Sequence, residues 1–196
     1  MTGLCLFSVG IVSAISCERA PVSIQSLIRT IPHYPKPGVM FRDITTLLKD
    51  PVGLQLTIGE LLQRYQGRPV DKVVGIESRG FIVGAALAYP LRAGFVPLRK
   101  RGKLPAETMG QDYELEYGAD RLEMHVDAVG KGERILLVDD LIATGGTAEA
   151  AVKLIGDAGA SIVECAFIIE LPELGGRRRL EALGHTVFSL VAFEGH

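Results

Sequence analysis

The sequence predicts an α/β domain with a central, mainly parallel sheet flanked by helices, and two observations support this fold class. Short apolar runs without polar alternation, at residues 72–77 and 135–138, are typical of strands buried on both faces of a parallel sheet. Each run is followed by a polar or glycine-rich turn and then by a helical pattern, at residues 82–89 and 148–155. Strands that alternate with helices in this way pair in parallel.

Length and composition limit the number of domains and the possible partners. The chain has 196 residues, of which 47% are hydrophobic, enough for one core but hardly for two. We expect one domain over residues 22–196, preceded by an extension, residues 1–21, whose role is unassigned. A net charge of −2 argues against a nucleic-acid or anionic-membrane surface. The extension has neither the basic n-region of a signal peptide nor an apolar run long enough to span a membrane, so we expect a cytoplasmic protein. The three cysteines are scattered, so we expect no disulfide framework.

The remaining elements follow from caps and periodicity. Asp50-Pro51 is typical of a helix start, and that helix is expected to end at Gly67. Residues 104–112 lack periodicity and contain breakers, which predicts a mobile loop. The other expected elements are a helix at 23–30, strands at 95–100, 161–171 and 186–193, and alternating, half-exposed strands at 113–118 and 122–126.

The stretch from Arg134 to Thr147, R-I-L-L-V-D-D-L-I-A-T-G-G-T, is the most informative part of the chain. Two carboxylates, Asp139 and Asp140, stand at the carboxyl end of its strand, and a Thr-Gly-Gly-Thr turn leads into a helix. Free N–H groups of a helix's first turn, joined by threonine hydroxyls, form an anion cradle. Neither a Walker loop nor a dinucleotide fingerprint is present. The residues suit a ribose 5-phosphate, although an acid pair and an ordinary glycine turn alone would also fit a solvated strand end.

The full string resembles the phosphoribosyl pyrophosphate (PRPP) signature of the type I phosphoribosyltransferase family, in which the acids hold the ribose 2- and 3-hydroxyls and the loop holds the 5-phosphate. Three other stretches are similar to the members of this family that use adenine: P-K-P-G-V-M-F-R-D-I-T at 35–45, R-K-R-G-K-L-P at 99–105 and L-E-Y-G at 115–118. The resemblance implies the type I phosphoribosyltransferase fold, with a small N-terminal hood and a flexible antiparallel flap.

It also implies an activity in purine salvage: transfer of the 5-phosphoribosyl group from PRPP to adenine, which gives AMP and pyrophosphate. A phosphoribosyltransferase for another base and a PRPP-binding regulator are the alternatives. The basic run at 99–103 and the two alternating strands would form a lid over pyrophosphate, although a solvated hairpin has the same pattern.

The family's functional residues map onto three groups in this sequence. The implied catalytic residues are Glu116, Arg79 and Arg99. The implied PRPP-binding residues are Glu77, Ser78, Arg79, Gly80, Lys100, Lys103, Asp139, Asp140, Ala143, Thr144, Gly145, Gly146 and Thr147. The implied adenine-binding residues are Met40, Phe41, Arg42 and Leu171. The family also implies a cis peptide between Glu77 and Ser78, where this chain has Glu in place of the more usual Asp.

By resemblance, Phe41 and Leu171 would enclose the purine ring from its two faces. The carbonyl of Met40 would accept a hydrogen bond from the 6-amino group, and the N–H of Arg42 would donate to N1. Hypoxanthine has the opposite donor and acceptor pattern at these atoms, so such a site should reject it. Glu116 would contact N7 of the base.

The resemblance further implies Mg²⁺ as cofactor, held mainly by PRPP and water, with no metal ligand supplied directly by the protein. It implies a homodimer in which Arg99 reaches the partner's active site. The strand end gives some independent support, because Arg99 and Lys100 alternate in direction and one of them must face away from its own loop.

Overall fold

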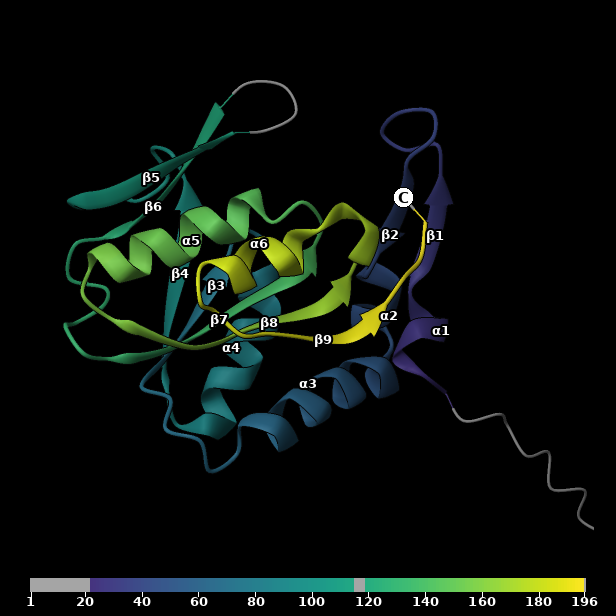
Figure 1. Cartoon of the computed structure of the whole chain (residues 1–196). Coiled ribbons are helices and arrows are strands. Elements are labelled where there is room, and N and C mark those ends of the chain that lie inside the picture. Colours follow the sequence, from purple (N-terminus) through teal and green to yellow (C-terminus); the bar gives the residue numbers. More distant parts are fainter. Residues whose placement is uncertain (1–21, 115–118, 196) are drawn as a thin grey trace, which may run out of the picture.

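The computed structural model describes residues 22–114 and 119–195. A seven-stranded sheet with the order β5-β6-β4-β3-β7-β8-β9 forms its centre, and a separate two-stranded sheet, β1-β2, lies beside it (Figure 1). The five strands from β4 to β9 in that order are parallel, which confirms the predicted fold class. They are β4 (Gly94–Lys100), β3 (Lys72–Ile76), β7 (Arg134–Ile142), β8 (Ser161–Glu170) and β9 (Val187–Ala192). The expected extension at residues 1–21 lies outside the described residues.

Helices cover both faces of the sheet (Figure 1). Alternating side chains divide the core in two: Leu136 of β7 belongs to one cluster and the next residue, Leu137, to the other. The first cluster takes in α3 (Pro51–Tyr65) and α4 (Arg79–Leu91), and the second takes in α5 (Gly146–Asp157) and α6 (Gly176–Ala182). The shorter helices are α1 (Ile24–Leu27), α2 (Thr45–Lys49) and the 3₁₀ turn η1 (Pro172–Leu174). No helix within the described part of the chain is both long and apolar enough to cross a membrane.

The N-terminal prediction is correct in part. Ser23 caps α1 through the N–H of Ser26, but the helix ends at Leu27, so the predicted helix at 23–30 is wrong beyond that point. Residues Arg29–Pro32 instead form β1, which pairs with β2 (Met40–Asp43) in an antiparallel sheet, the hood. The pairing of β1 with β2 therefore outweighs the local helical periodicity of these residues. Asp50 does cap α3 as predicted, accepting from the N–H groups of Val52 and Gly53.

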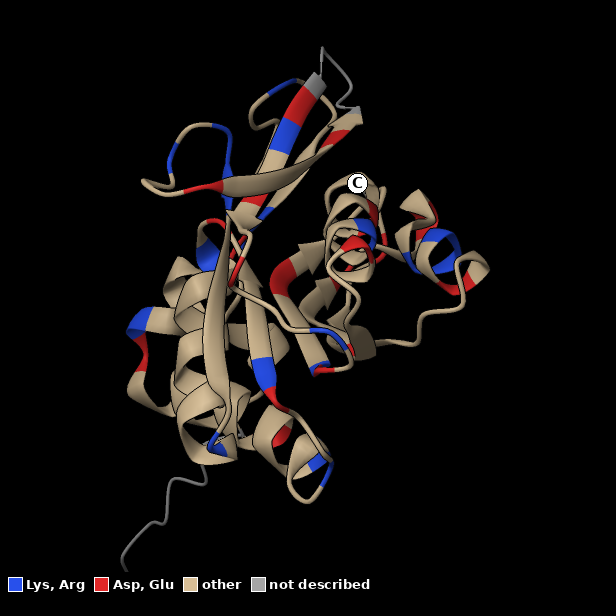
Figure 2. Ribbon diagram, turned by 90° about the vertical axis from the view of Figure 1, so that its left-hand side faces the viewer, with Lys and Arg blue, Asp and Glu red and all other residues tan. Residues whose placement is uncertain are grey.

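The predicted mobile loop at 104–112 is wrong in its second half, because β5 (Thr108–Glu114) begins there. This strand pairs with β6 (Ala119–His125) along its length, with Met109 opposite Met124, and the two form the antiparallel flap. Figure 2 shows the flap rising from the body with acidic and basic segments along it. Glu123 was expected to be exposed but is buried, since its carboxylate accepts from the N–H of Gly102 at 2.8 Å.

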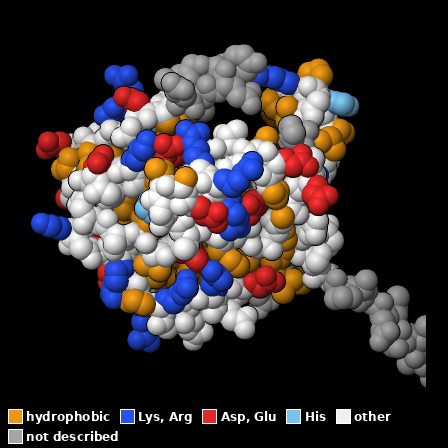
Figure 3. Space-filling model, in the orientation of Figure 1, with side chains coloured by type: hydrophobic (Ala, Val, Ile, Leu, Met, Phe, Trp, Pro, Cys, Tyr) orange, Lys and Arg blue, Asp and Glu red, His pale blue; other side chains and the backbone are white. Residues whose placement is uncertain are grey.

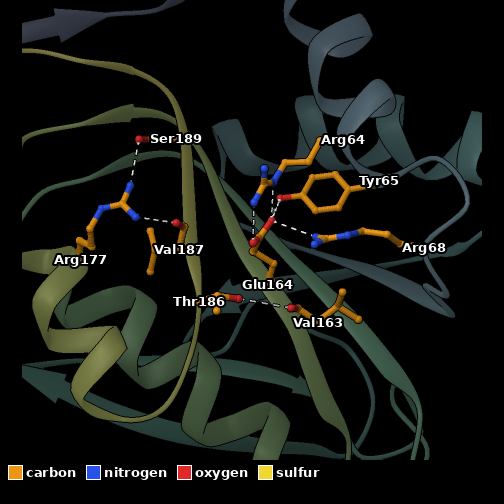
Figure 4. Close-up of polar contacts among 9 residues, drawn as sticks. All are labelled: Arg64, Tyr65, Arg68, Val163, Glu164, Arg177, Thr186, Val187 and Ser189. Carbon is orange, nitrogen blue, oxygen red and sulfur yellow. Dashed lines mark hydrogen bonds and ion pairs between the residues drawn. The ribbon is translucent and has the colours of Figure 1, made fainter.

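A buried carboxylate fastens α3 to β8 (Figure 4). Glu164 accepts from Nε and Nη2 of Arg64, at 2.6 and 2.8 Å, from the hydroxyl of Tyr65 at 2.8 Å, and from Nη1 of Arg68 at 3.3 Å. Burial opposes ionisation of this carboxyl, but the hydrogen bonds from Arg64 and Tyr65 lower its pKa. Tyr65 therefore has a polar partner inside the core, in addition to the apolar contacts that the helix periodicity predicts.

Candidate active site

A cavity of about 300 Å³ lies at the carboxyl ends of β3 and β7. The chain continues from β3 to β4 on one side and from β7 to β8 on the other, so the two strands flank the point where the strand order reverses. Ligands of open α/β sheets bind at such a point. The cavity is lined by Ile76, Glu77, Arg79, Lys100, Tyr113, Leu122 and every residue from Asp139 to Ala148.

The predicted anion cradle forms the floor of this cavity. β7 extends to Ile142, so Asp139 and Asp140 lie within the strand and not after it, and α5 begins at Gly146, two residues earlier than predicted. Gly145 has φ +81°, and a Cβ there would lie 2.9 Å from Cα of Gly176. The turn therefore requires glycine both for its backbone conformation and for its contact with the start of α6.

The acid pair is tied to the neighbouring turn. Nε of Arg79 lies 2.5 Å from Oδ2 of Asp140, and the N–H of Asp140 donates to Oδ1 of Asp139 at 2.9 Å. Desolvation and the adjacent Asp140 carboxylate raise the pKa of Asp139 well above its usual range. Burial acts against the charge on Arg79, but the Asp140 carboxylate raises the pKa of that guanidinium. The cavity thus holds two interacting carboxyl groups and one charged arginine that forms an ion pair with Asp140.

The turn after β3 has the expected backbone. The peptide between Glu77 and Ser78 is cis, as the resemblance implied. A Cβ at Gly80 would lie 2.8 Å from the carbonyl oxygen of Val138 and 2.9 Å from Oδ1 of Asp139. Only glycine lets the start of α4 lie this close to β7, so Gly80 brings Arg79 to the acid pair. Glu77 and Arg79 line the cavity, whereas Ser78 and Gly80 do not.

Glu77 contacts three residues of the basic run at 99–103. This carboxylate forms an ion pair with Lys103, accepts from the N–H of Lys100 at 3.0 Å and lies 3.5 Å from Nε of Arg99. Burial opposes ionisation of Glu77, but the hydrogen bond from Lys103 lowers its pKa. Nζ of Lys100 lies 3.1 Å from Asp120 in the flap. Both Arg99 and Lys103 therefore lie against an acid of the turn after β3 in the same chain.

Tyr113 is a cavity residue that sequence reasoning missed. Its side chain is buried near the end of β5, and its hydroxyl donates to Asp120 at 3.2 Å. Burial and the Asp120 carboxylate raise the pKa of Tyr113 to about 12, so the phenol is neutral near pH 7. The only signal in the sequence was its place in an alternating strand, which does not show what the strand faces. Leu122, on the paired strand β6, was missed for the same reason.

The residues expected to bind adenine come from two other elements. Met40, Phe41 and Arg42 lie on β2 in the hood, where the ring of Tyr34 contacts Phe41 edge-on at 5.2 Å. Leu171 directly follows β8, and its N–H donates to the carbonyl of Ile142 at 3.0 Å, beside the start of the phosphate loop. None of the four lines the 300 Å³ cavity. Glu116 lies outside the described residues.

A second charged cluster lies where α6 meets β8 and β9, and Figure 4 shows its Arg177 bonded to Val187 and Ser189. Arg177, the second residue of α6, donates from Nε to Glu170 at 2.8 Å and from Nη1 to the carbonyl of Val187 at 2.6 Å. The N–H of Gly176 donates to the carbonyl of Ala143 at 3.0 Å. The buried Glu170–Arg177 pair therefore fixes α6 to β8 and β9 and so holds Gly176 against the phosphate loop.

The donor set around the cavity suits a magnesium ion that arrives with its ligand. Among the residues that the structure describes, no three His, Cys, Asp or Glu side chains are arranged to hold a metal. Of the two β7 carboxylates, Asp140 is already bonded to Arg79. Mg²⁺ commonly keeps several waters and binds through one or two carboxylates and substrate phosphates. The site fits that arrangement and does not form a protein cage for the ion.

A fold with this switch-point cavity, acid pair and glycine loop defines the phosphoribosyltransferase class, and the family model described as Phosphoribosyl transferase domain matches residues 46–188. Adenine phosphoribosyltransferases from Nitrosomonas europaea and Nitrosospira multiformis are each 66% identical to this chain, over 88% and 89% of its length and 99% and 100% of theirs. The chain belongs to the adenine phosphoribosyltransferase family.

Solved structures agree with this assignment. The adenine phosphoribosyltransferase of Rhodothermus marinus is 52% identical and superposes with a TM-score of 0.81, covering 87% of this chain and 96% of its own. The enzyme of Saccharomyces cerevisiae, solved with an imino-altritol bisphosphate and adenine, is 38% identical with a TM-score of 0.80, covering 86% and 96%.

Proposed function

We propose that this protein transfers the 5-phosphoribosyl group of PRPP to adenine, forming AMP and pyrophosphate in purine salvage. The observation that carries the proposal is the meeting, in one cavity, of the acid pair Asp139–Asp140, the phosphate loop and Arg79. A ribose 5-phosphate needs acceptors for its hydroxyls and donors for its phosphate, and both line this cavity. The high identity to adenine phosphoribosyltransferases supports adenine as the base.

In this proposal the phosphate loop holds the 5-phosphate of PRPP. The N–H groups at the start of α5 point into the turn, and the residues that hold the phosphate are Ala143, Thr144, Gly145, Gly146 and Thr147. The carboxylates of Asp139 and Asp140 accept hydrogen bonds from the ribose hydroxyls. Because Asp140 is bonded to Arg79 in the free protein, binding of PRPP releases this arginine toward the pyrophosphate.

The pyrophosphate is held by the turn and the basic loop that meet at Glu77. Ser78, Arg79 and Gly80 contribute from the start of α4, and Lys100 and Lys103 contribute side-chain cations. Arg99 and Lys103 both lie next to the Glu77 carboxylate, so the loop places positive charge beside the proposed pyrophosphate position. Mg²⁺ bound with PRPP supplies further neutralisation of the phosphates.

Adenine is read by the hood. Phe41 and Leu171 close on the two faces of the ring, the carbonyl of Met40 accepts from the 6-amino group, and the N–H of Arg42 donates to N1. Backbone atoms of a paired strand suit this task because β1 and β2 hold each other in register, with Thr30 opposite Arg42. A base with the reverse donor pattern leaves these groups unpaired.

Glu116 contacts N7 of the base as N9 attacks C1 of the ribose. Support for this role comes from the described part of the flap, since Tyr113, which precedes Glu116 in the sequence, lines the cavity wall. The transition state resembles an oxocarbenium ion, and nearby carboxylates stabilise its positive charge. Glu116, Arg79 and Arg99 are the residues to which we assign the catalytic roles.

We extend the proposal to a cytoplasmic homodimer in which Arg99 acts in the partner's site. The inner side of α4 packs Val83 and Leu87 into the core, while Ile82 and Tyr89 on its outer side are 51% and 88% exposed. An exposed apolar helix face next to the strand that carries Arg99 fits a second copy of this chain. Arg99 would exchange its contact with Glu77 for the partner's pyrophosphate.

The activity is tested by incubating the protein with PRPP, Mg²⁺ and one base at a time, and measuring pyrophosphate. Release of pyrophosphate with adenine, matched by AMP, is expected. Turnover with hypoxanthine or guanine but not with adenine would overturn the choice of base. Binding of PRPP without turnover of any base would favour a regulator.

A further inference from the structure

We propose that residues Phe193–Gly195, the tail segment, position the hood through the side chain of Arg42 and thereby set the affinity and selectivity for the base. The inference rests on the proposed reading of adenine by the backbone of β2. It assigns the Arg42 guanidinium a positioning role, separate from the base contact proposed for its backbone N–H.

The Arg42 side chain grips the tail segment. Its Nη2 donates to the carbonyl oxygens of Glu194 and Gly195, at 3.1 and 3.4 Å, and its guanidinium lies over the ring of Phe193, 4.4 Å from the centroid. On the other side, Nη1 donates to the hydroxyl of Thr30 at 2.6 Å. One side chain therefore joins both strands of the hood to a segment more than 150 residues away in sequence.

The tail segment is in turn bonded to the opposite wall of the base site. The N–H of Phe193 donates to the carbonyl of Glu170 at 3.0 Å, and the N–H of Gly195 donates to Oε1 of Glu173 at 3.3 Å. These two acceptors flank Leu171 in sequence. Figure 1 shows the chain leaving β9 and running to the side of β2. The segment thus spans the distance between the backbone of β2 and Leu171.

This link sets a distance on which base recognition depends. The hood is a two-stranded sheet, and such a sheet is marginally stable by itself. The two walls of the proposed sandwich come from separate sheets, so their spacing depends on the contacts between them. Hydrogen bonds to a base edge lose much of their strength when donor and acceptor move apart by a fraction of an ångström. A hood freed from the tail should therefore lose adenine affinity and discrimination before it loses the fold.

Two variants release the link from opposite ends. Arg42→Gln keeps the backbone N–H and the strand pairing but removes the guanidinium, and Phe193→Ala removes the ring beneath it. We expect each to raise the KM for adenine about tenfold, with the KM for PRPP within about twofold of the wild-type value. The preference for adenine over hypoxanthine should fall by a similar factor. In the double variant the two effects should not add, because both changes remove the same contact, that between Arg42 and Phe193.

Arg29→Gln is the matched control. Arg29 is also a hood arginine, but its guanidinium bonds to Asp43 within the hood, and no contact with the tail segment is present among the described residues. It should leave the KM for adenine within about twofold. If Phe193→Ala does not fold, Phe193→Leu provides the smaller change. Unaltered adenine KM in folded Arg42→Gln and Phe193 variants, or equal increases for adenine and PRPP, would overturn the positioning role alone. Failure of the wild type to use adenine would overturn both this inference and the proposed function.

Discussion

Nε of Arg79 lies 2.5 Å from Oδ2 of Asp140, so the first residue of α4 is bonded to β7 at the edge of the cavity. The pair joins two stretches that sequence reasoning assigned to different parts of PRPP, the ribose and the pyrophosphate. The approach is possible because Gly80 lets α4 lie against Val138. In the proposed function, binding of PRPP at these two residues would compete with this ion pair.

The double variant Asp139→Asn/Asp140→Asn tests the role of the acid pair. Asparagine keeps size but cannot accept charge-assisted hydrogen bonds from the ribose hydroxyls, so the affinity for PRPP should fall about 10- to 100-fold. The fold should survive, because neither side chain lies in the two apolar clusters. Titration calorimetry with PRPP and Mg²⁺ measures the affinity, and circular dichroism checks the fold. A folded variant that binds PRPP normally would remove the pair from the site.

Mixed dimers test whether Arg99 acts across the interface. Arg99→Ala and Glu116→Gln should each be nearly inactive as homodimers; for Glu116→Gln we expect a rate loss of about 10²–10⁴-fold, the usual range for general acid–base assistance. After joint unfolding and reassociation, about half the dimers are mixed, and each regains one intact site. Roughly a quarter of wild-type sites should return. No recovery, with mixed dimers confirmed by mass, would place Arg99 in its own subunit's site or outside the site.

Tyr65→Phe tests the buried cluster around Glu164. The change removes one hydrogen bond to a charged acceptor in the core, so the free energy of unfolding should fall by about 1.5–3 kcal/mol. Tyr34→Phe is the control, since that hydroxyl belongs to a 54% exposed side chain outside the proposed dimer face and its loss should cost less than about 0.5 kcal/mol. Urea unfolding measures both. Equal effects of the two changes would show that the Tyr65 hydroxyl adds nothing.

Asp43 makes the stability of the hood depend on pH. The hydrogen bonds from Arg29 and from the N–H of Thr45 lower the pKa of Asp43 from 3.8 to about 2. Since the folded-state value is the lower one, this carboxylate stabilises the fold above its unfolded pKa, and the contribution disappears as pH falls from about 4 to 2. The difference in unfolding free energy between wild type and Asp43→Asn should be constant above about pH 5 and shrink below pH 4. A pH-independent difference would contradict the shift.

The buried strands and the phosphate loop could be predicted because their signals are local. An apolar run without alternation marks β3 and β7, and Thr144–Thr147 specifies the turn by itself. The strand β1 was missed because its conformation depends on pairing with β2, which local periodicity does not record. The start of β5 was missed for the same reason, since its residues 108–112, which were expected to be a loop, pair with β6.

Buried carboxylates were the other failure. The alternating pattern presents Glu123 as solvated, and the strand pattern at 161–171 does not show the environment of Glu164 and Glu170, yet each is buried against an arginine or a backbone N–H. Their partners are distant in sequence: Arg64 precedes Glu164 by a hundred residues. Site residues that depend on such long-range contacts, Tyr113 among them, become visible only when the strands are placed side by side.

The selectivity between adenine and hypoxanthine tests the central claim most directly. Both bases are offered at saturating PRPP and Mg²⁺, and kcat/KM is measured for each by pyrophosphate release. In the proposed function the hood presents an acceptor to the 6-amino group and a donor to N1. Hypoxanthine would leave both unpaired, so adenine should be preferred by about 10⁴-fold or more. A ratio near one, or a preference for hypoxanthine, would contradict base reading by the backbone of Met40 and Arg42.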